Sequence, residues 1–149
     1  MLRTRRSAST GNDRRGTAIV ETALVIPIFF TVILGIAEFG RALMVANLLT
    51  NAAREGARLS IMNGVSAADV RSSVIQQVKN TVGVTLSNND VSILITPYPG
   101  NPDPNNEPLN ANTRDLCAIE VSVNYSDVSL VLRFLNDARI RGQAAMRHE

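Results

Sequence analysis

The sequence predicts an α+β fold, with a long N-terminal helix, a second short helix and a small antiparallel sheet packed on the outer half of the long helix. Three observations predict it. The longest uncharged run of the 149 residues, 22–37, follows a basic N-terminal segment. A helical spacing of apolar residues continues beyond that run. After residue 90, apolar and polar residues alternate with the period of a strand. The length argues for one folded domain beside the apolar helix.

The N-terminal charge pattern predicts a membrane span. Residues 1–16 hold five arginines and one aspartate, whereas 17–37 hold a single charge, Glu21. Twenty-one residues of helix extend roughly 31 Å, about the thickness of a bilayer core. Basic residues before the span, including Arg14 and Arg15, keep the N-terminus in the cytoplasm. The chain is therefore expected to have three parts: a basic cytoplasmic leader at 1–16, a transmembrane helix at 17–37 and an exported α+β domain at 38–149.

Helix one is expected to start near Thr17, to bend at Pro27 and to continue to about Asn63-Gly64, where glycine can take a left-handed cap. Past Ala37 its spacing predicts one apolar stripe that packs on the sheet. The stripe consists of Ile36, Phe39, Leu43, Ala46, Thr50, Ala53 and Ala57. Leu43→Asp should then destabilise the exported domain. The i,i+3 pairs Glu38–Arg41 and Glu55–Arg58 are interpreted as exposed supports.

The remaining elements follow from capping and alternation. A second helix is expected over 67–82, started by a capping box of Ser66 and Asp69 and closed by Gly83. Strands are expected over 91–96, 117–125 and 140–148. The segment 128–135 fits either a short helix or a strand. Cys117 shares the parity of the apolar strand residues and is interpreted as a core residue.

The segment 97–113 is a candidate functional loop. It contains five of the six prolines and five asparagines. A connection of this length without its own secondary structure usually carries function or is mobile.

The composition argues against several functions. A formal net charge of +2 does not favour nucleic-acid binding, and with 4% aromatic residues and no tryptophan the chain lacks stacking platforms for single strands. One histidine and one cysteine cannot form a His/Cys metal site. Paired carboxylates, a nucleophile elbow and a phosphate-binding loop are not evident. We therefore expect no enzyme activity, no metal and no cofactor.

Gly16 and Glu21 form the sharpest local motif, because an acid inside an apolar span is costly. One interpretation is that Glu21 lies near the interface and reaches the headgroups. In the other, cleavage after Gly16 creates an α-amine at Thr17, and Glu21 pairs with that amine on its own or a neighbouring chain.

These residues resemble the TadE-like pseudopilins of tight-adherence (Flp-type) pilus systems. The segments that carry the resemblance are 15–27, 35–43 and 49–58, and 144–149 is more weakly similar to the family's tail. The chain departs from the family at Thr22, where an aromatic residue is common. The resemblance implies a prepilin-type processing site at Gly16 and Thr17, cut by a prepilin peptidase at the cytoplasmic face.

It further implies a minor pseudopilin-like structural component of a bacterial pilus assembly or secretion system. Such a component is a single-pass protein of the inner membrane with a periplasmic or other extracytoplasmic domain. Its partners are the lipid bilayer, other pilin-like subunits and the assembly machinery. Two alternatives stay open: a membrane-tethered binding module that uses the 97–113 loop, and a secreted domain released by signal cleavage after Gly35-Ile36-Ala37.

Overall fold

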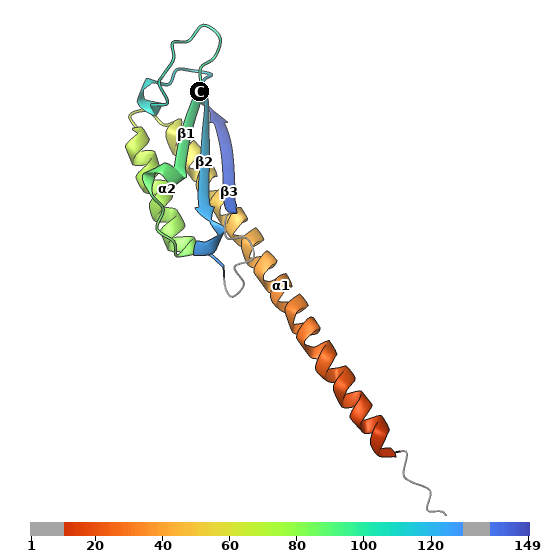
Figure 1. The fold of residues 1–149 in the computed structure, drawn as a ribbon. Coiled ribbons are helices and arrows are strands. Elements are labelled where there is room, and N and C mark those ends of the chain that lie inside the picture. Colours follow the sequence, from red (N-terminus) through yellow and green to blue (C-terminus); the bar gives the residue numbers. More distant parts are fainter. Residues whose placement is uncertain (1–10, 130–137) are drawn as a thin grey trace, which may run out of the picture. The chain divides into compact units, whose positions relative to one another are not determined.

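The computed structural model describes residues 11–129 and 138–149 and has the expected α+β fold (Figure 1). The main elements are helices α1 (Gly11–Ser60) and α2 (Ala67–Val82) and strands β1 (Val91–Thr96), β2 (Leu116–Asn124) and β3 (Arg139–Arg147). Of the segment 128–135, for which the sequence fits either a helix or a strand, residues 130–135 lie outside the described part of the chain. The chain divides into two compact units, one ending at Ala37 and one of Glu38–Glu149.

Helix α1 contributes residues up to Ala37 to the first unit. It begins at Gly11 rather than near Thr17, so the last part of the leader is helical. Arg14 and Arg15 are good helix formers, and no proline lies between Gly11 and Thr17 to end the helix. The helix continues through Pro27. Of the described residues, only this helix is long and apolar enough to cross a membrane, with a mean hydropathy of 2.4 in its most apolar window.

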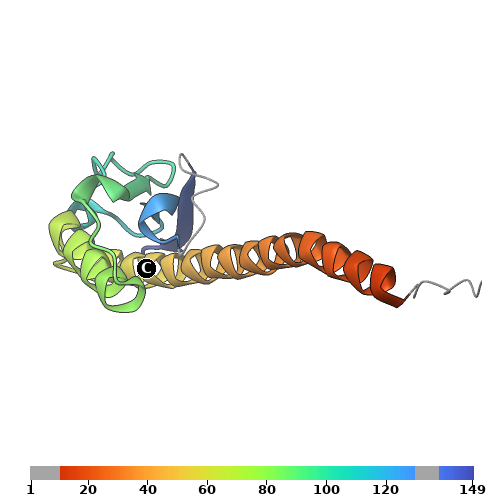
Figure 2. The same ribbon diagram turned by 60° about the horizontal axis from the view of Figure 1, so that its bottom comes forward.

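The second unit contains a three-stranded antiparallel sheet in the order β1-β2-β3. Val91 pairs with Val121, and Cys117 pairs with Met146. The alternation puts the inward side chains of β1 and β2 into one core, among them Ile93, Ile119 and Cys117. Helix α2 and the part of α1 after Ala37 cover this face (Figures 1 and 2). The expected strands and the core position of Cys117, 0% exposed, are confirmed.

Helix α2 has the predicted bounds and caps. Ser66 and Asp69 form the capping box, and Gly83 ends the helix in a left-handed conformation with φ of 83°. Val70, Val74 and Val78 lie on one stripe and are buried.

The outer part of α1 packs closely because its buried face is made of small residues. A Cβ on Gly56 would lie 2.6 Å from Cγ2 of Val74 on α2. Where β3 crosses the helix, a Cβ on Gly142 would lie 2.3 Å from the Thr50 nitrogen. At Gly142 the added Cβ would collide with the backbone of α1, and at Gly56 it would collide with the Val74 side chain. Glycine is therefore required for packing at both.

The face of α1 that packs on the sheet differs from the predicted stripe. Ala53 and Ala57 are buried as expected, but Phe39 and Leu43 are 64% and 67% exposed, and the helix packs through Val45 and Leu49 instead. The expectation that Leu43→Asp destabilises the domain is therefore wrong. The predicted stripe follows the largest apolar side chains of the helix. Close packing of the helix on the sheet instead favours the side of the helix that carries alanine and glycine.

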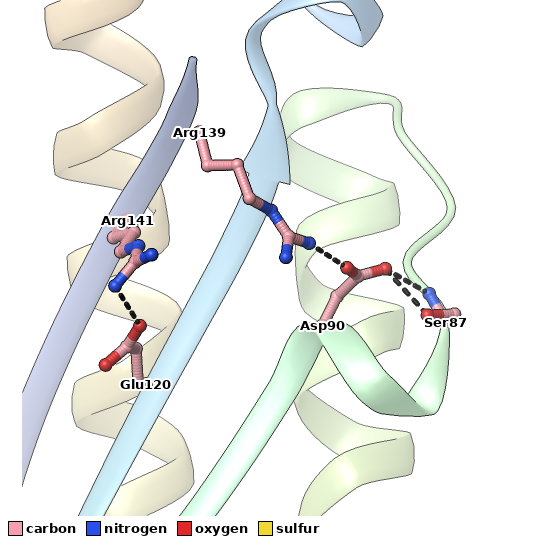
Figure 3. A network of polar contacts seen from close by, with 5 residues as sticks. All are labelled: Ser87, Asp90, Glu120, Arg139 and Arg141. Carbon is pink, nitrogen blue, oxygen red and sulfur yellow. Dashed lines mark hydrogen bonds and ion pairs between the residues drawn. The ribbon is translucent and has the colours of Figure 1, made fainter. Parts of the chain in front are cut away.

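Charged side chains cross the outward face of the sheet at the start of β3 (Figure 3). Arg139 reaches over β2 to form an ion pair with Asp90, which also accepts hydrogen bonds from the backbone and hydroxyl of Ser87. Arg141 pairs with Glu120 at 3.3 Å. The first contact connects β3 to the segment that precedes β1, and the second connects β3 to β2. They help to hold the register of this edge strand.

Candidate functional site

The residues of the predicted processing site lie on consecutive turns of α1. Thr17 and Glu21 are four residues apart, so their side chains lie on the same face of the helix. Glu21 is exposed. Arg14 and Arg15 belong to the same helix, and their side chains lie outside what the structure describes.

Gly16 has no packing role in the described fold. A Cβ placed on it would meet nothing within 4 Å. Glycine inside a helix costs about 0.5–1 kcal/mol relative to alanine, so the fold itself gives no reason for glycine here. Gly35 and Gly40 have the same open surroundings, so free space alone does not mark a processing site.

The helix around this motif exposes an apolar surface on all sides. Every large apolar side chain from Ile19 to Ile36 is exposed, by 38% to 69%. A helix that is apolar all round is stable only when another apolar phase covers it, such as a larger protein or a membrane. The candidate site therefore lies at the N-terminal end of a candidate membrane span.

A polar cluster that sequence reasoning missed holds the outer part of α1 onto the domain. The Tyr125 hydroxyl donates a 2.7 Å hydrogen bond to Oε1 of Glu38, and both residues are 4% exposed. The Arg41 guanidinium donates to the carbonyl of Val128. Burial, reinforced by the Glu38 carboxyl group, raises the pKa of Tyr125.

Glu38 and Arg41 were expected to form an exposed i,i+3 pair. Instead, both side chains are directed into the domain, while Glu55–Arg58 does form the expected exposed pair at 2.7 Å. The only sequence signal that distinguishes Glu38–Arg41 from Glu55–Arg58 is that Glu38 directly follows an apolar run. Its partner lies 87 residues away, beyond the reach of local pattern analysis.

The 97–113 loop is held by hydrogen bonds to the carboxylate of Asp115, a residue that is 0% exposed. Its Oδ1 accepts hydrogen bonds from the Tyr98 amide at 2.8 Å and the Asn101 side chain at 2.7 Å, and its Oδ2 accepts one from the Asn112 amide at 2.8 Å. Burial alone would raise the pKa of Asp115, but these hydrogen bonds and the nearby His148 outweigh it and lower the pKa. The loop is thus organised around one carboxylate.

Two further side chains of the loop satisfy backbone groups of the fold. Asn106 accepts a hydrogen bond from the Ile95 amide of β1 at 2.8 Å. Glu107 accepts one from the Ala67 amide at the start of α2, at 2.7 Å. These contacts give the loop a structural role. It caps a strand and a helix N-terminus.

The remaining candidates for a chemical site are possible metal ligands and the Cys117 thiol. In the described part of the chain, no three His, Cys, Asp or Glu side chains are grouped so that they could hold a metal. The Cys117 thiol is buried, and that burial raises its pKa. A thiol that stays protonated is a poor nucleophile.

Comparison with known proteins places the N-terminal motif in a family. Residues 16–58 match the family model of TadE-like proteins. Neither a curated protein nor a solved structure matches the chain. The matched segment begins at Gly16 and ends within the last turn of α1. TadE-like proteins are structural proteins associated with tight-adherence pili, and they carry an apolar N-terminal helix. The predicted resemblance to TadE-like proteins is confirmed for residues 16–58, the segment that the family model matches.

Proposed function

We propose that the protein is a minor pseudopilin-like component of a tight-adherence pilus assembly or secretion system, anchored in the bacterial inner membrane by the first part of α1. One observation carries this proposal. The TadE-like match covers the helix whose apolar side chains are exposed on all sides. Those side chains need either lipid or like helices around them, and a pseudopilin meets both in turn.

The proposed orientation has the N-terminus in the cytoplasm and residues 38–149 outside it. Five arginines and one aspartate precede the span, while the residues after it carry a net charge of −1. Excess arginine close to a span stays on the cytoplasmic side. Arg14 and Arg15 are the basic residues nearest to it.

In this proposal a prepilin peptidase cuts between Gly16 and Thr17. Gly16 is unexplained by packing, which is the expected situation when a protease rather than the fold requires a residue. Cleavage would leave an α-amine at Thr17, one helical turn from Glu21. The carboxylate could neutralise that amine on its own chain or on a neighbouring pilin-like subunit, which would offset the cost of both charges beside hydrocarbon.

Two variants and a mass measurement test the proposal. The full chain is expressed with the pilus assembly genes, and its mature N-terminus is sequenced. We expect the mature chain to begin at Thr17. Gly16→Leu should retain the uncut mass, while Glu21→Gln should be cut but should fail to co-purify with pilin-like subunits.

Gly40→Leu is the matched control, because Gly40 is an open helical glycine like Gly16 and lies far from the proposed cut. It should be processed normally. A mature chain that begins at Glu38 would support the secreted-domain alternative. A chain that begins at Met1 and forms no association with pilus components would support a tethered binding module.

A further inference from the structure

Three large apolar side chains on the outer part of α1 face away from the domain. Phe39, Leu43 and Met44 are 64%, 67% and 61% exposed. They lie within two turns of helix and on the side opposite to Val45 and Leu49, which are 3% and 0% exposed. We refer to Phe39, Leu43 and Met44 as the outer apolar stripe.

The charges that interrupt the sequence near this stripe are withdrawn from its surface. Glu38 is buried and accepts the hydrogen bond of Tyr125, and Arg41 is half-buried and donates to the Val128 carbonyl. As a result, the exposed side chains of α1 carry no charge between Glu21 and Arg54. Past Met44, the exposed side of the helix becomes polar at Asn47 and Asn51.

The helix from Thr17 to Met44, in which Glu21 near one end is the only exposed charge, is long enough to cross a bilayer together with its headgroup regions. From Thr17 to Met44, a helix rising 1.5 Å per residue extends about 42 Å. The hydrocarbon core of a bilayer is about 30 Å thick, and the core with its headgroup regions is about 40–45 Å thick. A span that ends at Ala37 fills only the core. A helix that is apolar on one side as far as Met44 also crosses one interface.

We propose that the outer apolar stripe binds the lipid surface on the side of the folded domain, at the boundary between acyl chains and headgroups. The inference rests on the proposed membrane anchoring and adds the depth to which the chain is embedded. The helix leaves the membrane near Asn47 rather than at Ala37, with the domain held directly on the lipid. Burial of Glu38 and Arg41 then has a purpose beyond packing, since it keeps both charges off the lipid-facing side of the helix.

Tryptophan fluorescence tests this directly, because the chain has no tryptophan of its own. Leu43→Trp places a single indole in the stripe. Phe30→Trp places one in the proposed span, and Leu94→Trp places one on an exposed strand residue, 56% exposed, of the folded domain. Each full chain is reconstituted in phosphatidylethanolamine–phosphatidylglycerol vesicles whose lipids carry bromine at shallow acyl positions. All three sites are exposed, so the substitutions leave the core intact, and circular dichroism checks this.

We expect bromine to reduce the emission of Leu43→Trp and Phe30→Trp strongly and to leave Leu94→Trp unchanged. Quenching of Phe30→Trp without quenching of Leu43→Trp would overturn the lipid contact and leave the anchoring intact. A blue-shifted but unquenched Leu43→Trp would also overturn it, since it would show that a protein partner covers the stripe. Failure to quench Phe30→Trp would contradict the anchoring and, with it, this inference.

Discussion

Helix α1 is one helix, but its side chains meet different surroundings before and after Ala37. Before Ala37 all large apolar side chains are exposed, and no part of the most apolar 18-residue stretch of the helix is buried. After it, the face that packs on the sheet consists mainly of alanine, glycine and a few larger residues such as Val45 and Leu49. Lipid accepts large side chains in any direction, whereas close packing on a sheet requires small ones on one side. Residue size, rather than hydrophobicity, separates the two environments.

The largest effect should come from placing a charge on the two sides of the outer part of α1. Leu49→Asp should cost about 2–5 kcal/mol for lost packing alone, and more for the buried carboxylate. Leu43→Asp should cost much less, because the Leu43 side chain faces away from the core and loses no packing inside the domain. Chemical unfolding of the full chain in detergent measures both. Equal destabilisation would show that the outer apolar stripe is part of the core.

Glycine substitutions sharpen the same comparison. Gly142→Ala should destabilise the domain by about 1–3 kcal/mol, since its Cβ would meet the backbone of α1. Gly40→Ala, in open space on α1, should be neutral or slightly stabilising through helix propensity. Thermal unfolding followed by circular dichroism compares them. A neutral Gly142→Ala would mean that β3 does not lie against the helix as described.

The polar contact between α1 and the domain should contribute an amount similar to that lost in Gly142→Ala. Tyr125→Phe removes the hydrogen bond to Glu38 and should cost about 1–3 kcal/mol. Tyr98→Phe, at a 38% exposed position, is the matched control and should cost little. Urea unfolding measures the difference. Identical midpoints for the two variants would remove Tyr125 from the contacts that fix the helix.

Acid should release the 97–113 loop before it unfolds the domain. The folded-state pKa of Asp115 is lowered, so its stabilising contribution is complete above the unfolded pKa of about 4 and is lost as the pH falls through the lower folded value. Hydrogen exchange at the Tyr98 and Asn112 amides, relative to the intrinsic rate of an unprotected amide at the same pH, should therefore accelerate at low pH. Asp115→Asn should accelerate it already at neutral pH. Asp103→Asn, an exposed loop residue, is the control and should leave both amides unchanged.

Local sequence patterns predicted most of the fold. The alternation in 91–96 and 116–124 and the Ser66–Asp69 capping box each depend on neighbouring residues, so they can be found without tertiary information. The processing motif is also linear, and for this reason Gly16, Thr17 and Glu21 could be named from the sequence.

What sequence analysis missed depends on contacts between distant residues. The inward face of α1 is set by where β3 approaches at Gly142, and Glu38 is buried only because Tyr125 lies beside it. The role of the 97–113 loop likewise depends on Asp115, which reads in the sequence as one more scattered acid. Periodicity identified the helix, but it could not identify the side that packs.

In the proposed topology, the first part of α1 crosses the inner membrane and carries the domain to the other side. A topology measurement tests it most directly, with a reporter enzyme active only outside the cytoplasm fused after Glu149 and a second reporter active only inside fused at the same place. We expect activity of the first reporter and none of the second. Activity of the cytoplasmic reporter alone would contradict the orientation, the anchoring and the proposed role in pilus assembly.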